Sequence, residues 1–160
     1  MTIAPNQQRY LPAGLPAPAV IDDALDSAFW AGTRDHRLMV QTCAQCGSAQ
    51  WPPEEICSAC HSFERTWVQA SGHGKVFSWT RIWHPVHPAL RDHGPYIVVI
   101  VELYDYPVRI AGNLLGDPHQ AVQAGIPVRA AFEDGPDGKY ALVQWLPTPN
   151  ADAGTEVVRG

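Results

Sequence analysis

The sequence predicts a mainly β protein with an N-terminal helix, a small metal-binding ribbon and a five-stranded barrel. Three observations support this prediction. Four cysteines form two Cys-x-x-Cys pairs within residues 42–61, β-branched and aromatic runs separated by turn residues fill positions 75–146, and one amphipathic segment precedes both. The expected divisions of the 160-residue chain are an arm with the helix, the ribbon, the barrel and a flexible tail, at residues 1–36, 37–70, 71–147 and 148–160.

The N-terminal helix is predicted over residues 22–34. Asp22 or Asp23 can cap it, acidic residues suit its first turn, and its apolar face carries Ile21, Leu25 and Phe29. Trp30 lies off this face, so it packs either on the metal module or against another subunit. The preceding residues 1–20 contain four prolines and show no periodicity, so they form an extended arm that is either a disordered tether or docks on a partner.

The cysteine pairs predict a structural metal site. Each pair can bind one ion from a tight turn, and together Cys43, Cys46, Cys57 and Cys60 supply the four thiolates of a tetrahedral zinc site. Four sulfur ligands leave no position open for water or substrate, so we expect this ion to stabilise the fold. Iron in a rubredoxin-like site is the alternative ion. Two disulfides are the alternative to a metal, which we disfavour because the sequence shows no signal peptide.

The region after Ser71 predicts a small barrel. Turn residues separate five expected strands, at 76–83, 96–103, 107–115, 128–133 and 139–146. A short helix is expected at 119–124, closed by Gly125. Five strands with a helix between the third and fourth are typical of an OB-fold barrel. In the first strand, alternation predicts Val76, Ser78, Thr80 and Ile82 on one face and Phe77, Trp79, Arg81 and Trp83 on the other.

Charge and hydropathy exclude some classes of partner. The net charge of −5 argues against a nucleic acid, which needs clustered lysine and arginine. The longest aliphatic run, residues 97–101, is far shorter than a membrane span. We therefore expect a cytoplasmic protein that binds neither nucleic acid nor membrane.

The order of motifs is similar to that of a known family. A helix with Phe29-Trp30, a Cys-x-x-Cys-Gly turn, Trp51-Pro52-Pro53 and a second Cys-x-x-Cys precede a barrel that opens Gly72-x-Gly74-x-Val76-x-Ser78-x-Thr80. The motifs Val101-Glu102-Leu103, Gly112-Asn113-Leu114 and Gly125-x-x-Val128 follow. Over about residues 25–146, this order resembles the acyl-CoA-associated zinc-ribbon/OB-fold proteins known as domain of unknown function thirty-five. The sequence departs from that pattern at Glu54, where relatives often have a basic residue.

The resemblance implies a function in a complex. Members of this family are typically small subunits of thiolase-like enzymes, including thiolases, acyltransferases and lipid-transfer-type aldolases that act on CoA thioesters, and the partner carries the catalytic residues. We therefore expect a non-catalytic, zinc-containing accessory subunit of a hetero-oligomer that shapes or shields an acyl-CoA site shared with a thiolase-like catalytic subunit. The alternatives are a free-standing nucleic-acid-binding protein and an enzyme that uses His84 or His87 as a base.

Five residues are candidate contacts with the acyl-CoA or the partner, namely Trp79, Arg81, His84, His87 and Arg109. If the arginines share a barrel face with Trp79 and Trp83, this face could take the nucleotide end of CoA; the alternative is a solvated face. Each histidine precedes a proline, and the resulting extended backbone places the two imidazoles about 9 Å apart, which is too wide for two ligands of one ion. Their loop is either a rigid connector or lies near the partner's active site.

Overall fold

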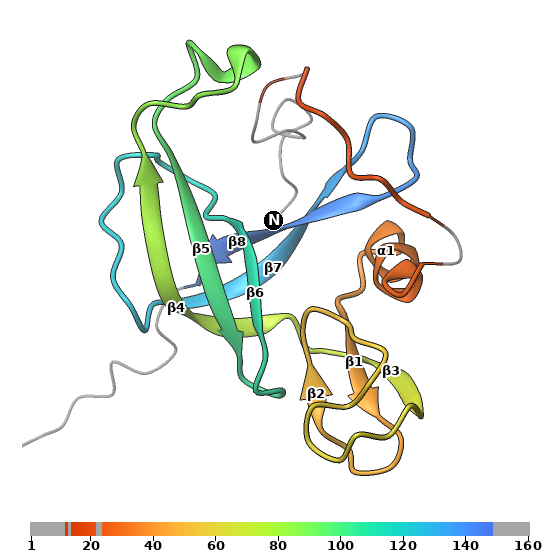
Figure 1. Ribbon diagram of the computed structural model, residues 1–160. Helices are drawn as coiled ribbons and strands as arrows, with labels where there is room; N and C mark the ends of the chain where they lie inside the picture. Colours follow the sequence, from red (N-terminus) through yellow and green to blue (C-terminus); the bar gives the residue numbers. More distant parts are fainter. Residues whose placement is uncertain (1–11, 13, 22–23, 149–160) are drawn as a thin grey trace, which may run out of the picture.

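Helix α1 (Ser27–Arg34) is followed by a three-stranded ribbon and a five-stranded barrel in the computed structural model (Figure 1). The structure describes residues 12, 14–21 and 24–148, so the predicted flexible tail beyond Thr148 and most of the arm lie outside the described residues. This architecture confirms the predicted fold class. Within the described part of the chain, no helix has the length and apolar character that crossing a membrane requires.

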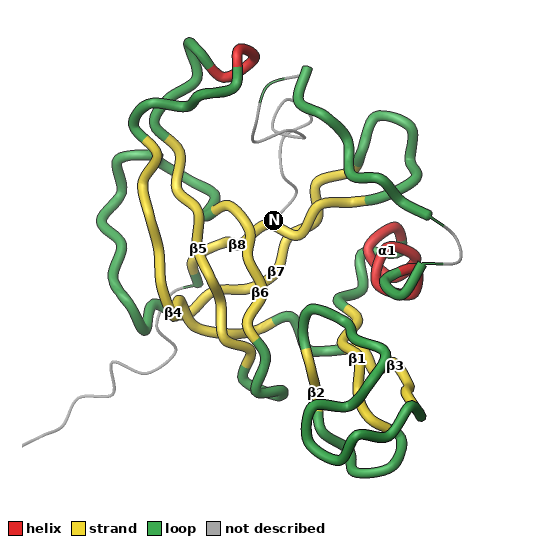
Figure 2. The backbone as a smooth tube through the Cα atoms, in the orientation of Figure 1, coloured by secondary structure: helices red, strands yellow, loops and turns green. Residues whose placement is uncertain are grey.

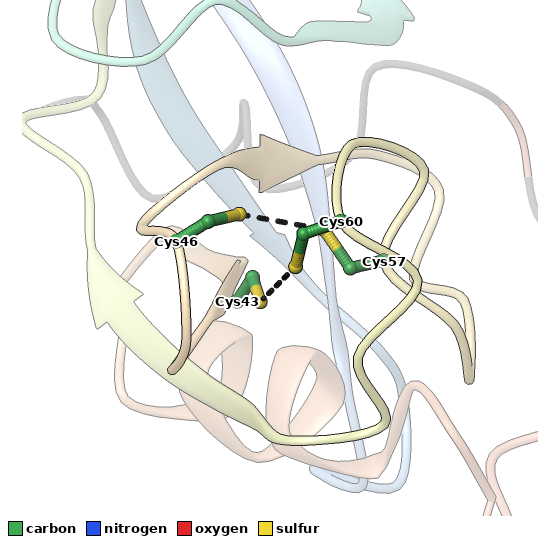
Figure 3. A group of neighbouring side chains, drawn as sticks. All are labelled: Cys43, Cys46, Cys57 and Cys60. Carbon is green, nitrogen blue, oxygen red and sulfur yellow. Dashed lines mark hydrogen bonds between the residues drawn. The ribbon is translucent and has the colours of Figure 1, made fainter.

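The ribbon is a small antiparallel sheet of strands β1 (Met39–Cys43), β2 (Ala49–Gln50) and β3 (Arg65–Gln69), in the order β2-β1-β3. The central strand β1 ends at the first cysteine, so the sheet directly positions one of the predicted metal ligands. Its pairing with β2 sets Gln41 opposite Gln50. The two long turns that carry the cysteines lie together at one end of the ribbon (Figure 3).

The barrel contains strands β4 (His73–Ile82), β5 (Tyr96–Leu103), β6 (Arg109–Asn113), β7 (Pro127–Asp134) and β8 (Ala141–Pro147). Their order is β6-β5-β4-β7-β8, and all neighbouring pairs are antiparallel. A parallel bridge between Leu114 and Trp145 joins the two edge strands and closes the sheet on itself (Figure 2). The connection from β4 to β5 contains one short 3-10 helix, η1 (Pro88–Leu90).

Helix α1 begins later than predicted. The proposed capping residues Asp22 and Asp23 lie outside the described residues, and the helix starts after Asp26, with no acidic residue in its first turn. The Asp26 carboxylate accepts a hydrogen bond of 2.7 Å from Trp30 Nε1 instead of capping a backbone N–H group. Hydrogen bonds from the Ala24 and Ser27 N–H groups to the third preceding carbonyl form turns before the helix, which explains its shorter length.

Two aromatic residues of α1 join the ribbon to the barrel. Phe29 is 6% exposed, and its ring centroid lies 4.5 Å from that of Trp51 in the ribbon. Trp30 makes an edge contact of 6.2 Å with Tyr140, which immediately precedes β8. Trp30 therefore faces the barrel, a contact that neither sequence-based alternative named. Figure 1 shows α1 between the ribbon and the far end of the β7–β8 hairpin.

The predicted helix at residues 119–124 is wrong. This segment forms turns, in which the His119 N–H donates to Asp117 Oδ1 and the Gln120 N–H donates to the Asp117 carbonyl. The Gln120 carbonyl, which a helix would use internally, accepts a hydrogen bond from Arg81 in β4. A helix of six residues is only marginally stable by itself, so these long-range and turn contacts decide the conformation.

The predicted alternation along β4 is also wrong, because a register shift lies between Val76 and Ser78. Val76 pairs with the buried Val101, but Ser78 pairs with the outward-facing Ile100. An inserted residue of this kind moves every following side chain to the opposite face of the strand. The residues after the shift are therefore assigned to new faces, with Trp79 opposite Val99 and Arg81 opposite Ile97.

The first prediction concerns the contact between α1 and the ribbon. We expect Phe29→Ala to lower the free energy of unfolding by about 3–4 kcal/mol, because it removes a buried ring from the aromatic contact with Trp51. Phe63→Ala is the matched control, since Phe63 is 65% exposed and its loss should cost less than about 0.5 kcal/mol. Chemical denaturation followed by circular dichroism measures both values, and equal effects would contradict this role of Phe29.

Candidate metal centre and contact residues

The four cysteines converge on one point at the end of the ribbon. Cys43 ends β1, Cys46 lies in the following turn, and Cys57 and Cys60 belong to the second turn (Figure 3). All four Sγ atoms lie within 4.8 Å of one another. Sulfur atoms of different Cys-x-x-Cys pairs lie close together: the Sγ–Sγ distance is 3.6 Å between Cys43 and Cys60 and 3.7 Å between Cys46 and Cys57.

These separations fit a metal site and not a pair of disulfides. Sulfur atoms bonded to a tetrahedral zinc at about 2.3 Å lie about 3.8 Å apart, which is close to the observed values. A disulfide would bring the sulfurs to about 2.05 Å, and all four cysteines are free in the structure. The donor set and its geometry therefore fit the structural zinc that the sequence predicts.

The two cysteine turns have the same backbone geometry. In the first turn, the Gly47 N–H donates to the Cys43 carbonyl at 2.9 Å, and in the second the His61 N–H donates to the Cys57 carbonyl at the same distance. Both donors are left-handed, with φ of 75° at Gly47 and 61° at His61. The turns thus present their sulfur atoms in equivalent ways, although only the first has a glycine at the left-handed position.

Electrostatics explain why the cluster requires a cation. Hydrogen bonds from the Ser48 side chain and N–H group lower the pKa of Cys46 to about 6, and the Cys46 N–H group lowers the pKa of Cys43. The Ser62 N–H group also lowers the pKa of Cys60, but the neighbouring Cys46 thiol, burial and the other two thiols raise it to about 12. Four adjacent thiolates therefore repel one another unless a divalent ion neutralises them.

A buried glutamine, which we did not identify from the sequence, supports the second cysteine turn. Gln41 is 1% exposed, and its side-chain amide forms two hydrogen bonds with the backbone of Glu54. Gln41 Nε2 donates to the Glu54 carbonyl at 3.0 Å, and the Glu54 N–H donates to Gln41 Oε1 at 2.9 Å. Gln50 also donates to Gln41 Oε1, and its own Oε1 accepts from the Ser58 N–H. Only the backbone of Glu54 is used, so the acidic side chain there is compatible with this arrangement.

Of the five candidate contact residues, the structure brings Trp79 and Arg81 together. The Arg81 guanidinium carbon lies 5.7 Å from the Trp79 ring centroid and 5.6 Å from that of Trp83, so the cation lies between two indole rings. Its Nη2 donates to the Gln120 carbonyl at 2.5 Å. Trp83 in turn lies 5.7 Å from His119, between ring centroids.

The two candidate histidines lie in the loop after β4. His87 occupies the N-cap position of η1, where its Nδ1 accepts a hydrogen bond of 3.2 Å from the Ala89 N–H. His84 is exposed, one residue beyond Trp83. The cap bond holds His87 to its own loop, whereas the exposed ring of His84 faces solvent.

Arg109 lies on the outer face of the barrel, apart from Arg81. Its Nε and Nη2 both donate to Glu102 Oε2, at 3.1 and 3.0 Å, and its guanidinium carbon lies 3.4 Å from the Phe77 ring centroid. These bonds from Arg109, with a further one from Lys75, lower the pKa of Glu102. Arg109 and Lys75 contact the same glutamate, and Lys75 is six residues, or about 20 Å, from Arg81 along β4. Arg109 and Arg81 therefore do not belong to one site.

A cavity that contains none of the candidate contact residues lies between α1, the ribbon and the barrel. It has a volume of about 440 Å³, and aromatic side chains of Phe29, Trp30 and Trp51 form one wall while residues of β6 and β8 form the other. The walls of this cavity come from segments that are far apart in the chain, so local sequence patterns could not predict it.

Removal of one zinc ligand should unfold the ribbon. We expect Cys43→Ser to abolish the binding of one zinc ion per chain, since three sulfurs cannot complete the site and zinc binding is coupled to folding. Metal analysis and amide hydrogen exchange over residues 39–69 measure the two effects. His84→Ala is the control and should keep its zinc. Full zinc content in the Cys43 variant would refute the site.

Substitutions at the left-handed positions of the two turns, Gly47 and His61, should change stability in opposite directions. Gly47→Ala should lower the stability of the zinc-loaded chain by about 1 kcal/mol, because a Cβ there meets no atom within 4 Å and the cost is therefore conformational. His61→Gly should raise the stability by up to about 1 kcal/mol, because it relieves the same strain. Denaturation midpoints at saturating zinc compare them; shifts in the same direction would contradict the equivalence of the turns.

Comparison with known proteins matches both parts of the chain to one family. Residues 30–64 match the family model described as "ChsH2, rubredoxin-like zinc ribbon domain", and residues 67–133 match "ChsH2, C-terminal OB-fold domain". The zinc-ribbon match includes all four cysteines, in agreement with the geometry of the metal centre.

Two curated relatives are named as subunits of hydratases. A probable enoyl-CoA hydratase alpha subunit of Thermomonospora curvata is 38% identical over 114 residues, which is 71% of this chain and 34% of the relative. The 3-oxo-4,17-pregnadiene-20-carboxyl-CoA hydratase alpha subunit of Mycobacterium tuberculosis is 35% identical over 155 residues, 87% of this chain and 46% of the relative. The chain thus spans less than half the length of either relative.

A solved structure matches over nearly its whole chain. It is described as "Ltp2-ChsH2(DUF35) aldolase" and superposes with a TM-score of 0.71 at 32% identity, over 82% of this chain and 98% of the matched chain. The resemblance found in the sequence is confirmed by these matches, and the chain belongs to the DUF35 family of zinc-ribbon/OB-fold proteins.

Proposed function

We propose that this chain is a non-catalytic accessory subunit of a hetero-oligomeric enzyme complex that acts on acyl-CoA thioesters. The match to the structure described as "Ltp2-ChsH2(DUF35) aldolase" carries this proposal, because it covers 82% of this chain and 98% of the matched chain. The names of the two hydratase relatives also support it, since each is described as one subunit of an enzyme whose substrate is a CoA ester.

The arrangement of reactive side chains favours an accessory role. All four cysteines face one another in the metal cluster, so no thiol remains as a nucleophile. His36 pairs with Asp134 at 2.8 Å, and His87 caps η1. Among the described residues, no histidine ring nitrogen is hydrogen-bonded to a hydroxyl or thiol group, which is the contact that activates a nucleophile.

For the partner, we propose a catalytic subunit of the thiolase superfamily that shares its acyl-CoA site with this chain. The barrel end that carries Trp79 and Arg81 supports contact with a partner protein, because it presents exposed indole rings and a cation on one surface. Arg109 and His87 are bound within the chain, so they are weaker candidates for direct contact. His84 remains a proposed contact at the same end of the barrel.

Purification and assay of the chain with and without its partner test this function. The tagged chain is co-expressed with the thiolase-superfamily proteins of its own genome, and size-exclusion chromatography with light scattering measures the complex. We expect a hetero-oligomer with one of them, acyl-CoA turnover by the complex, and none by the isolated chain. Turnover by the isolated chain, or no complex with any such protein, would refute the proposal.

A further inference from the structure

The second half of β4 is incompletely covered by the barrel. The pairing with β7 includes only His73, Gly74 and Lys75, and hydrogen bonds between Val76 and residues 125–126 end it. Beyond the register shift, the pairing of β4 among the described strands is with β5. Trp79 and Arg81 therefore point to the side of the sheet that carries the buried core of β5, at a place where none of the described strands encloses them.

The aromatic rings at this end remain available to another molecule. Trp79 is 40% exposed and Trp83 is 55% exposed. Val86, three residues beyond Trp83, is 99% exposed. Arg81 is fixed between the rings by its two aromatic contacts and by the Gln120 carbonyl. Large, immobilised aromatic and arginine side chains are the groups that contribute most to binding in protein interfaces.

Arg81 carries a positive charge that the described part of the chain does not neutralise. Within that part, no carboxylate lies within 4 Å of Arg81. The other described arginines that lack such a partner are exposed, whereas Arg81 is partly buried. Its Nε atom is buried and lacks a hydrogen-bond partner. A partly buried guanidinium in this state has lost hydration without gaining a counter-charge, so an incoming carboxylate would form strong, charge-assisted hydrogen bonds with it.

The side chains at this end favour a protein over a small ligand. The cavity between α1, the ribbon and the barrel contains none of these residues, and the two indole rings are partly exposed. Small molecules are bound mainly in pockets, whereas tryptophan and arginine are enriched among the residues that dominate binding between proteins. A single arginine in an acidic chain also gives little attraction for the many phosphates of a nucleic acid.

We propose that Trp79, Arg81 and Trp83 form the docking surface for the catalytic partner, and that Arg81 binds an aspartate or glutamate side chain of that partner between the two indole rings. This inference rests on the proposed function, since the partner is the acyl-CoA enzyme named there. It adds the location of the interface on this chain and the chemistry of the partner's contact.

Binding measurements with the full-length zinc-loaded chain and the co-expressed thiolase-superfamily subunit test the docking surface. Arg81→Glu and Trp83→Ala should each raise the dissociation constant by about thirtyfold or more, the effect of removing a central interface residue. Arg129→Gln is the control, because Arg129 is exposed and lies opposite His73, about 25 Å along β4 from Arg81. Its affinity should remain that of the unmodified chain. Zinc content and circular dichroism verify the fold of each variant.

The outcomes separate this inference from the proposed function. If the unmodified chain binds no thiolase-superfamily subunit, the proposed function fails, and the docking surface with it. If it binds and folded Arg81→Glu and Trp83→Ala bind equally well, only the docking surface is refuted. The partner's carboxylate can then be identified by charge exchange. An acidic residue of the partner is changed to arginine, and restored binding of Arg81→Glu identifies that residue as the contact of Arg81. Free CoA and oligo(dT) are also tested for quenching of the tryptophan fluorescence of this chain. Quenching that is absent in Arg81→Glu would overturn the inference, in favour of a small anion if CoA quenches or of a nucleic acid if oligo(dT) does.

Discussion

Four sulfur atoms held within 4.8 Å of one another cannot all be negatively charged unless a cation lies among them. This constraint organises the first half of the molecule. The two cysteine turns contain almost no hydrophobic side chains, yet they are brought to the same point, and the bridging glutamines hold the intervening loop to the ribbon. The ion thus replaces the apolar core that a ribbon of this size cannot build by itself.

The second half depends on apolar burial, and one irregularity in it determines what the surface presents. Val76, Val101 and Trp145 are almost completely buried, as expected for the interior of a small closed barrel. The register shift after Val76 then redirects the rest of β4. Without it, Arg81 would lie on the opposite face of the strand and could not reach the Gln120 carbonyl on the loop that follows β6. A local insertion in one strand therefore creates the aromatic and cationic end of the barrel.

Much of the architecture could be predicted because its signals are local. The spacing of the cysteines, the apolar run of β5 and the glycine- and proline-rich turns each depend on a few neighbouring residues. The errors arose where distant residues decide the outcome. The register of β4 depends on its pairing with β5, the conformation of residues 119–124 depends on Arg81 and Asp117, and the role of Gln41 depends on a loop 13 residues away.

The aromatic contacts of α1 have a consequence for how the molecule can act in an assembly. Phe29 contacts the ribbon while its neighbour Trp30 contacts the barrel, so two adjacent side chains oppose any hinge between the two parts. The polypeptide then behaves as a spacer of fixed length, whose metal-bearing tip and tryptophan-bearing tip keep a constant separation and orientation. A protein bound at one tip therefore determines the position and orientation of the other tip, and this chain can align two neighbouring proteins without a conformational change.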